Sequence, residues 1–222
     1  LVKDKDTKVF MDFGMSFSKE NKFFSQFLNA RGSNSLNDMF ELGILPKIKG
    51  LYRRDYAKHM DFGGDEETEI DAVLLTHAHV DHCAYIPYLR EDIPIYCSEE
   101  SKLIMQNFDD TGHDQYLTLK EKFQIYENKK GEISRATGDK VQIPRSIKVF
   151  KSNEEFSIDS IKVQPLPVDH SIAGVHAFVL HTSDGTIGNT ADLRFHGRRS
   201  KDTEKFVVTC GESDIDLLLC EG

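Results

Sequence analysis

One short segment constrains this chain more than any other: an apolar run at residues 72–75 leads directly into His77-x-His79-x-Asp81-His82. The run has the length and composition of a buried β-strand. Neutral imidazoles and ionised carboxylates are metal ligands, and four such residues this close together after a strand are rarely accidental. His77 and His79 project to one side at a strand end, whereas adjacent Asp81 and His82 diverge and suit a second ion. The spacing predicts a dinuclear hydrolytic centre.

This pattern resembles the His-x-His-x-Asp-His signature of the metallo-β-lactamase superfamily. The resemblance implies a mixed α/β fold, a four-layer αββα sandwich formed by one domain over residues 1–222. It also implies that His77 and His79 bind one metal and that Asp81 and His82 bind the other. The signature identifies the superfamily but hardly the substrate, because lactonases, thioesterases, β-lactamases and nucleases share it.

Two later segments supply further ligands by the same resemblance. His170 follows a strand-like run over 156–169, and this segment is similar to the third motif of the superfamily, which makes His170 the third ligand of the first metal. Asp169 is expected to orient His170. Asp192 lies in a segment similar to the fourth motif, whose aspartate bridges the metals. A bridging anion is chemically sensible, since two dications about 3.5–4 Å apart repel each other. An ordinary turn residue is the alternative for Asp192.

An early strand is expected over 8–13, with Asp12 near its end and a turn at Gly14. A carboxylate within an apolar run is costly unless a partner satisfies it. The superfamily places an aspartate here to support the metal-binding histidines through hydrogen bonds, and a turn-forming aspartate is the alternative. Strands that relatives carry before this point are expected to be missing.

The remaining pattern predicts helices and strands around these motifs. Helices are expected at 34–42, 84–90, 98–108 and 200–211. Strands are expected at 94–97, at 141–143 paired with 147–150, in a hairpin of 178–181 with 186–189, and as a final buried strand at 216–220.

Basic residues are candidates for an anionic substrate. Arg194, His196 and Arg198 form a compact cluster that either binds phosphate or is simply solvated. Arg53 and Arg54 either face the pocket from a covering wall or are solvated at the surface. The segment 111–151 is also basic, and either tracks a phosphate backbone or forms a solvated hairpin.

Composition bounds the class of protein. The 222 residues contain 39% hydrophobic residues, enough for one large core, and no apolar run approaches the length of a membrane span. No signal peptide is recognisable. Four cysteines without a Cys-x-x-Cys pair indicate buried thiols and a cytoplasmic location. The net charge of −9 argues weakly against broad nucleic-acid binding.

Segments 43–46, 51–56 and 216–221 resemble the ribonuclease J-like branch of β-CASP nucleases. In that branch the last metal-binding histidine and the β-CASP motifs come later, so the domain is expected to be incomplete at both ends. The implied function is hydrolysis of phosphodiesters in nucleic acid, most of all RNA, as in ribonuclease J or mRNA 3′-end processing.

Two divalent ions, expected to be zinc, would activate water to hydroxide, and Asp81 would accept its proton. The alternatives are a small-molecule hydrolase of the glyoxalase II or lactonase type, and a non-catalytic scaffold subunit of an RNA-processing complex. RNA is the expected partner. Binding to a membrane is not expected, and formation of a homo-oligomer is left open.

Overall fold

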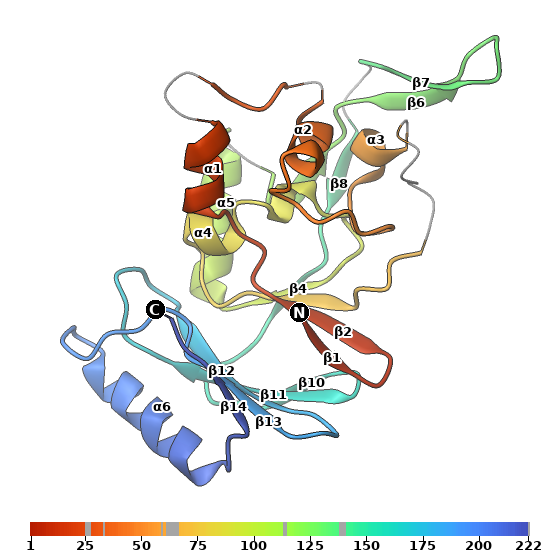
Figure 1. Ribbon diagram of the computed structural model, residues 1–222. Coiled ribbons are helices and arrows are strands. Elements are labelled where there is room, and N and C mark those ends of the chain that lie inside the picture. Colours follow the sequence, from red (N-terminus) through yellow and green to blue (C-terminus); the bar gives the residue numbers. More distant parts are fainter. Residues whose placement is uncertain are drawn as a thin grey trace.

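Two five-stranded sheets stack face to face at the centre of the molecule (Figure 1). The structure, a computed structural model, describes residues 1–24, 28–32, 34–58, 60, 67–112, 115–137 and 141–221. The first sheet has the order β1(Val2–Asp4), β2(Thr7–Met11), β3(Ala72–Leu74), β4(Ile95–Cys97), β9(Ile147–Val149). The second has the order β10(Phe156–Ile158), β11(Ile161–Pro167), β12(His176–His181), β13(Thr186–Asn189), β14(Leu217–Leu219).

Alternation along β3 divides the core of the first sheet. Ala72 and Leu74 pack toward the second sheet, whereas Val73 and Leu75 pack under the helices on the outer face. Successive side chains of a strand point to opposite faces, so a strand that is apolar throughout needs cover on both sides. The helices on this outer face are α1(Phe17–Phe23), α2(Ser35–Glu41), α3(Arg54–Ala57), α4(Val80–Cys83) and α5(Glu99–Asp110).

Strand β12 divides the second sheet in the same way. Phe178 and Leu180 contribute to the core between the sheets, and Ala177 and Val179 contribute to a core with Phe206 of α6(Ser200–Glu212). The layers are therefore helix, sheet, sheet and helix. The expected mixed α/β fold and its αββα order are confirmed.

Parallel strand directions bring the predicted site segments to one edge of the sandwich. β2 and β3 run parallel, and β11 and β13 are both antiparallel to β12. Asp12 and His77 follow the first pair of strands, while His170 and Asp192 follow the second pair. Ligand sites in sheets of this kind form where several strands end together, because backbone pairing stops there and side chains can converge.

Several expected elements are confirmed. Ser98 caps α5 by accepting a hydrogen bond from the backbone N–H of Ser101. α2 and α6 lie where helices were predicted, and β12 and β13 form the predicted hairpin with His181 opposite Thr186.

Four expectations about strands and helices are wrong. A strand does precede residue 8, since β1 pairs with β2. The segments 141–143 and 147–150 do not pair with each other: β8(Gln142–Pro144) pairs with β5(Thr118–Lys120), and β9 joins β4. Between them Arg145 is buried and donates hydrogen bonds to four backbone carbonyls, which fixes the chain at the change of sheet.

The helix expected at 84–90 begins earlier, as α4, and continues as a short 3-10 turn η1(Ile86–Tyr88). β14 is exposed rather than buried, because it is an edge strand whose one described neighbour is β13.

The basic segment 111–151 includes a hairpin that projects from the molecule, β6(Gln124–Glu127) with β7(Ile133–Ala136) (Figure 1). Lys129 and Lys130 lie exposed in its turn, which favours the solvated-hairpin interpretation. None of the four cysteines is in a disulfide; Cys83 and Cys97 are buried as expected, whereas Cys210 is half-buried and Cys220 is exposed. Among the described residues, no helix is both long enough and apolar enough to cross a membrane.

Candidate metal centre

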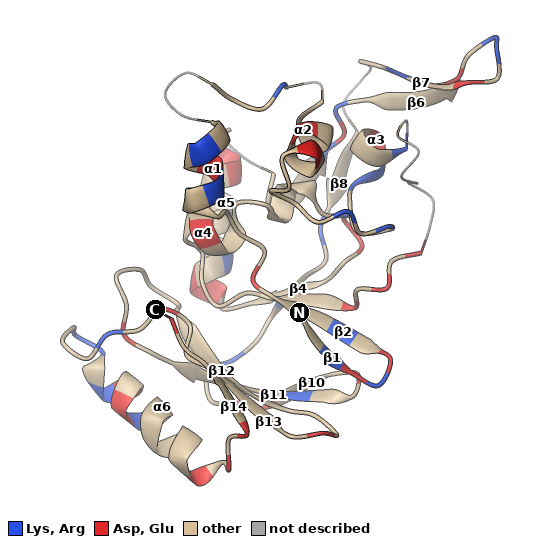
Figure 2. Cartoon of the chain, in the orientation of Figure 1, with Lys and Arg blue, Asp and Glu red and all other residues tan. Residues whose placement is uncertain are grey.

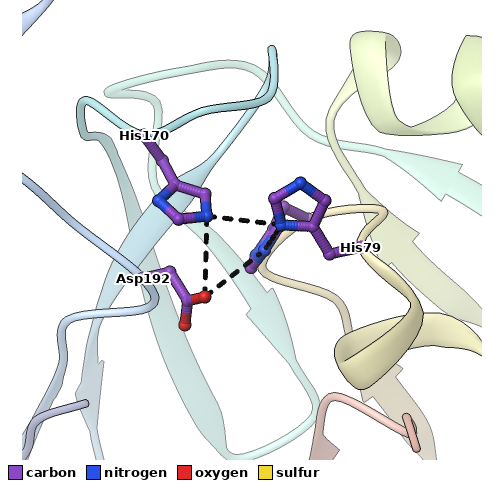
Figure 3. A group of neighbouring side chains, drawn as sticks. His79, His170 and Asp192 are labelled. Atoms are coloured by element: carbon purple, nitrogen blue, oxygen red, sulfur yellow. Dashed lines mark hydrogen bonds and ion pairs between the residues drawn. The ribbon is translucent and has the colours of Figure 1, made fainter. Parts of the chain in front are cut away.

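Three histidines and one aspartate converge at the edge where the strands end. His77 Nε2 lies 3.0 Å from His79 Nδ1, and His170 Nε2 lies 3.3 Å from the same atom. Asp192 Oδ2 lies 3.6 Å from His170 Nε2 and 3.9 Å from His77 Nε2. Figure 3 shows His79, His170 and Asp192 pointing toward one another from two different sheets. These four ligand atoms all lie within 4.8 Å of one another, close enough to surround a single ion.

A second group of ligand atoms adjoins the first. His82 Nε2 lies 3.3 Å from Asp192 Oδ1 and 3.7 Å from Asp81 Oδ2. Asp192 therefore presents one oxygen to each group, and the two groups of possible ligands share this carboxylate. The structure brings together all six residues predicted as ligands.

The local environment suits metal binding by neutral imidazoles. Burial, and then the charges of the neighbouring imidazoles, lower the pKa of His77 to about 2, so its ring is neutral and its Nε2 can donate a lone pair. Burial also lowers the pKa of His170. Burial opposes charge on His82 as well, but the hydrogen bond to Asp12 and three nearby carboxylates raise its pKa overall. A dication at Nε2 would satisfy Asp81 and Asp192, while Nδ1 keeps its proton for the hydrogen bond to Asp12.

Asp12 supports this centre from behind. Its Oδ2 lies 2.8 Å from His82 Nδ1, and its Oδ1 accepts a hydrogen bond of 2.7 Å from the backbone N–H of Thr76. Thr76 Oγ1 in turn lies 3.0 Å from His77 Nδ1. Carboxylates placed in this way fix the orientation and tautomer of a ligand histidine, leaving the opposite nitrogen free for the metal.

Gly14 lets β2 and α4 approach closely. A Cβ at this position would lie 2.0 Å from the carbonyl oxygen of Asp81 and 2.3 Å from the backbone nitrogen of His82. Real Cβ contacts are essentially never this short, so any side chain here would displace the turn that carries Asp81 and His82. Gly14 is therefore part of how the site is built.

Replacing Asp12 by asparagine is expected to weaken metal affinity by about 10- to 100-fold. Asp12 has a left-handed backbone, with φ of 56°, which asparagine also tolerates, so the substitution removes mainly the charge. Asp71→Asn is the matched control, because its carboxylate accepts a hydrogen bond from the backbone of Lys8, away from the ligands. Competition with a chelating indicator measures the affinity, and equal affinities for the two variants would contradict the supporting role.

Asp169 organises the loop that precedes α6. Its carboxylate contacts Arg194, with Oδ2 3.2 Å from Nε, and among the described residues no hydrogen bond joins it to His170. Burial alone would raise the pKa of Asp169, but Arg194 and the backbone N–H groups of Arg199 and Gly197 lower it. Asp169 therefore holds the neighbouring loop in place.

The three residues considered for phosphate differ in their surroundings. Arg194 is half-buried and paired with Asp169, whereas His196 and Arg198 are exposed. Arg53 is buried and paired with Asp55, so a solvated position is wrong for it. It lines a cavity together with Val80 and Tyr85, as a pocket-facing position requires.

Glu221 is a site residue that the sequence analysis missed. It accepts a hydrogen bond of 3.0 Å from the backbone N–H of Leu193, and its carboxyl adjoins Asp192. Burial and the neighbouring Asp192 raise the pKa of Glu221. Glu221 follows a strand that runs parallel to β13, whose end carries Asp192, so both carboxyls reach the same edge. No local sequence signal shows this pairing.

Known proteins place the chain in a family. The model of the β-lactamase superfamily domain matches residues 53–201, a range that contains the six ligand candidates. The crystal structure of a protein of unknown function from Enterococcus faecalis aligns over 100% of this chain and 45% of that one, with a TM-score of 0.70 and 25% identity.

Curated relatives are larger proteins. Ribonuclease J of Mycolicibacterium smegmatis is 26% identical over 164 residues, which cover 71% of this chain and 24% of that protein. Transcription termination factor FttA of Methanococcus maripaludis is 44% identical over 50 residues, or 21% of this chain and 8% of the factor. The chain thus matches at most about a quarter of the length of these two curated relatives. Since the family model covers well over half of its residues, the chain belongs to the β-lactamase superfamily.

Proposed function

We propose that this chain carries the dinuclear metal centre of a phosphodiester hydrolase that acts on nucleic acid, with RNA as the preferred substrate. The observation that carries the proposal is the pair of ligand groups sharing Asp192. A shared carboxylate is what two adjacent dications require. The names of the relatives, a ribonuclease and a transcription termination factor, favour nucleic acid over other substrates of the same fold.

In this proposal His77, His79 and His170 would hold one ion, Asp81 and His82 would hold the other, and Asp192 would be a ligand common to both. Zinc fits the imidazole-rich set best. The ions, when bound, supply a hydroxide at neutral pH and stabilise negative charge on a phosphate. The cytoplasmic location and the homo-oligomer stay predictions.

The protein residues have separate tasks around the substrate. Asp81 has a partly exposed side chain and lies beside His82, so it is placed to accept a proton from the attacking water. His196 and Arg198 are exposed on the loop that follows Asp192, where they can contact phosphate oxygens. Asp12 holds His82 in the orientation that binding requires.

A substrate panel tests this function. The metal-loaded protein, in its full-length form, is assayed against single-stranded RNA, single-stranded DNA, bis(p-nitrophenyl) phosphate, a thioester and a lactone. Hydrolysis of the phosphodiesters, with RNA fastest, is the expected result. Turnover of the thioester or the lactone alone would instead identify a small-molecule hydrolase. Stoichiometric metal with turnover of none of them would favour the scaffold subunit.

A further inference from the structure

A basic loop with an exposed aromatic ring lies next to the metal centre. It spans residues 193–199, between Asp192 and the start of α6, and we call it the 193–199 loop. Phe195 in this loop has 56% of its surface exposed, and the loop also carries exposed His196 and Arg198. Figure 2 shows basic residues along the stretch that enters α6. The exposed part of the Phe195 ring is apolar surface that a ligand can cover.

The loop is held at several points. The backbone N–H of Arg194 donates a 2.8 Å hydrogen bond to the carbonyl of Asp169, while its carbonyl accepts one of 3.1 Å from Thr203 Oγ1. The same hydroxyl accepts a hydrogen bond of 2.9 Å from the backbone N–H of Asp169. Arg194 and Asp169 also form an ion pair. The backbone immediately before Phe195 is therefore fixed, which preorganises the ring for a ligand.

Gly197 fixes the loop on the other side of the ring. A Cβ at this position would lie 1.9 Å from Asp169 Oδ2, so the chain turns tightly over this carboxylate. Phe195 thus lies between Arg194 and Gly197, which both contact Asp169, the residue that precedes His170.

The reach of the loop limits what Phe195 can contact. Phe195 is three positions after Asp192, so the two Cα atoms are at most about 11 Å apart. A nucleotide adjacent to a phosphodiester at the metal centre falls within this range. Bases of single-stranded nucleic acid stack on exposed aromatic rings, while basic side chains contact the phosphates of the backbone. Arg198, two residues after His196, supplies such a positive charge.

We propose that Phe195 is a stacking platform for a nucleobase of a single-stranded substrate, next to the phosphodiester that is hydrolysed. This inference rests on the proposed function and assigns a subsite to it. The ring recognises any base, because every base has a flat face. Phe195 therefore contributes to binding of a polynucleotide and contributes little to hydrolysis of a small ester.

The test compares two phosphodiesters, single-stranded RNA and bis(p-nitrophenyl) phosphate, on the metal-loaded, full-length protein. Phe195→Ala is expected to lower kcat/KM for RNA by about 5- to 150-fold, the range that corresponds to loss of one stacked base. Hydrolysis of the small ester is expected to be unchanged. Phe195→Trp should retain RNA hydrolysis, whereas Phe195→Leu, which keeps apolar surface without a ring, should not.

Tyr126→Ala is the matched control. Tyr126 is an aromatic residue with 49% of its surface exposed, on the β6–β7 hairpin at the other end of the molecule from α6 (Figure 1). It should leave both activities unchanged. RNA containing 2-aminopurine gives a second readout, since stacking on Phe195 is expected to quench its fluorescence in wild type but not in Phe195→Ala.

The outcomes separate the two proposals. If wild type hydrolyses both substrates and Phe195→Ala does so equally well, the stacking platform is wrong and the proposed function stands. Equal rates for the leucine and tryptophan variants would also reject stacking. If wild type hydrolyses neither phosphodiester, the proposed function fails and the inference fails with it. A change in protein association alone, with RNA kinetics unaltered, would show that Phe195 contacts a protein instead.

Discussion

Replacing His79 by alanine is expected to abolish phosphodiester hydrolysis and to lower the metal content of the protein. His79 Nδ1 is central to the first ligand group, 3.0 Å from His77 Nε2 and 3.3 Å from His170 Nε2. Charge stabilisation by a catalytic ion contributes several kcal/mol. At about 1.4 kcal/mol per tenfold, its loss corresponds to a fall in rate of about a thousandfold or more.

His181→Ala is the matched control for this variant. His181 lies at the end of β12, where its described side-chain contact is with Thr186, and it should keep full metal content and activity. Metal is counted by elemental analysis of the purified proteins, and hydrolysis is followed with bis(p-nitrophenyl) phosphate. Full activity in His79→Ala would end the dinuclear mechanism. A loss of activity with unchanged metal content would mean that His79 acts on the substrate rather than on an ion.

The candidate ligand residues could be recognised in the sequence because most of them are encoded locally. His77, His79, Asp81 and His82 lie within six residues, directly after a recognisable strand. Such spacing fixes their relative positions before any tertiary contact is known. His170 and Asp192 required a resemblance as well, since nothing local says that two strands of another sheet end at the same edge.

The supporting contacts were harder to predict because they join distant parts of the chain. Thr76 connects Asp12 to His77, but a threonine at a strand end carries no distinctive pattern. The partner of Asp169 was predicted to be His170, its neighbour in sequence, and the carboxylate instead contacts Arg194, 25 residues away. Side-chain direction at a strand end depends on local backbone twist, which periodicity does not report.

Strand pairing was the weakest part of the sequence analysis for the same reason. The segments at 142–144 and 147–149 look like a hairpin because only two residues separate them. Burial of the Arg145 side chain, with its backbone N–H bonded to the carbonyl of Leu117, sends them to different sheets. An arginine in a short loop normally indicates that the loop is exposed to solvent. The burial of Arg145 is therefore why the predicted pairing of the two strands is wrong.

Arg53 supports the helical layer beside the metal centre, and Arg53→Ala is expected to destabilise the fold by about 3–5 kcal/mol. Arg53 is only 4% exposed, and its Nε and Nη2 lie 2.7 and 2.9 Å from the two carboxylate oxygens of Asp55. Removing the guanidinium leaves a buried carboxylate without its counter-charge. Arg53 Nη2 also donates a hydrogen bond to the carbonyl of Lys120, and this carbonyl would lose its donor in the variant.

Chemical denaturation of the metal-free protein measures this effect, with Arg54→Ala as the matched control. Arg54 is the exposed neighbour in sequence, and its removal should change the free energy of unfolding by less than about 0.5 kcal/mol. Combining Arg53→Met with Asp55→Asn should recover part of the lost stability, because no charge then remains buried without a partner. If Arg53 instead serves the substrate, Arg53→Ala would raise KM for RNA and leave the unfolding transition where it is in wild type. That result would return Arg53 to the set of residues that contact an anionic substrate.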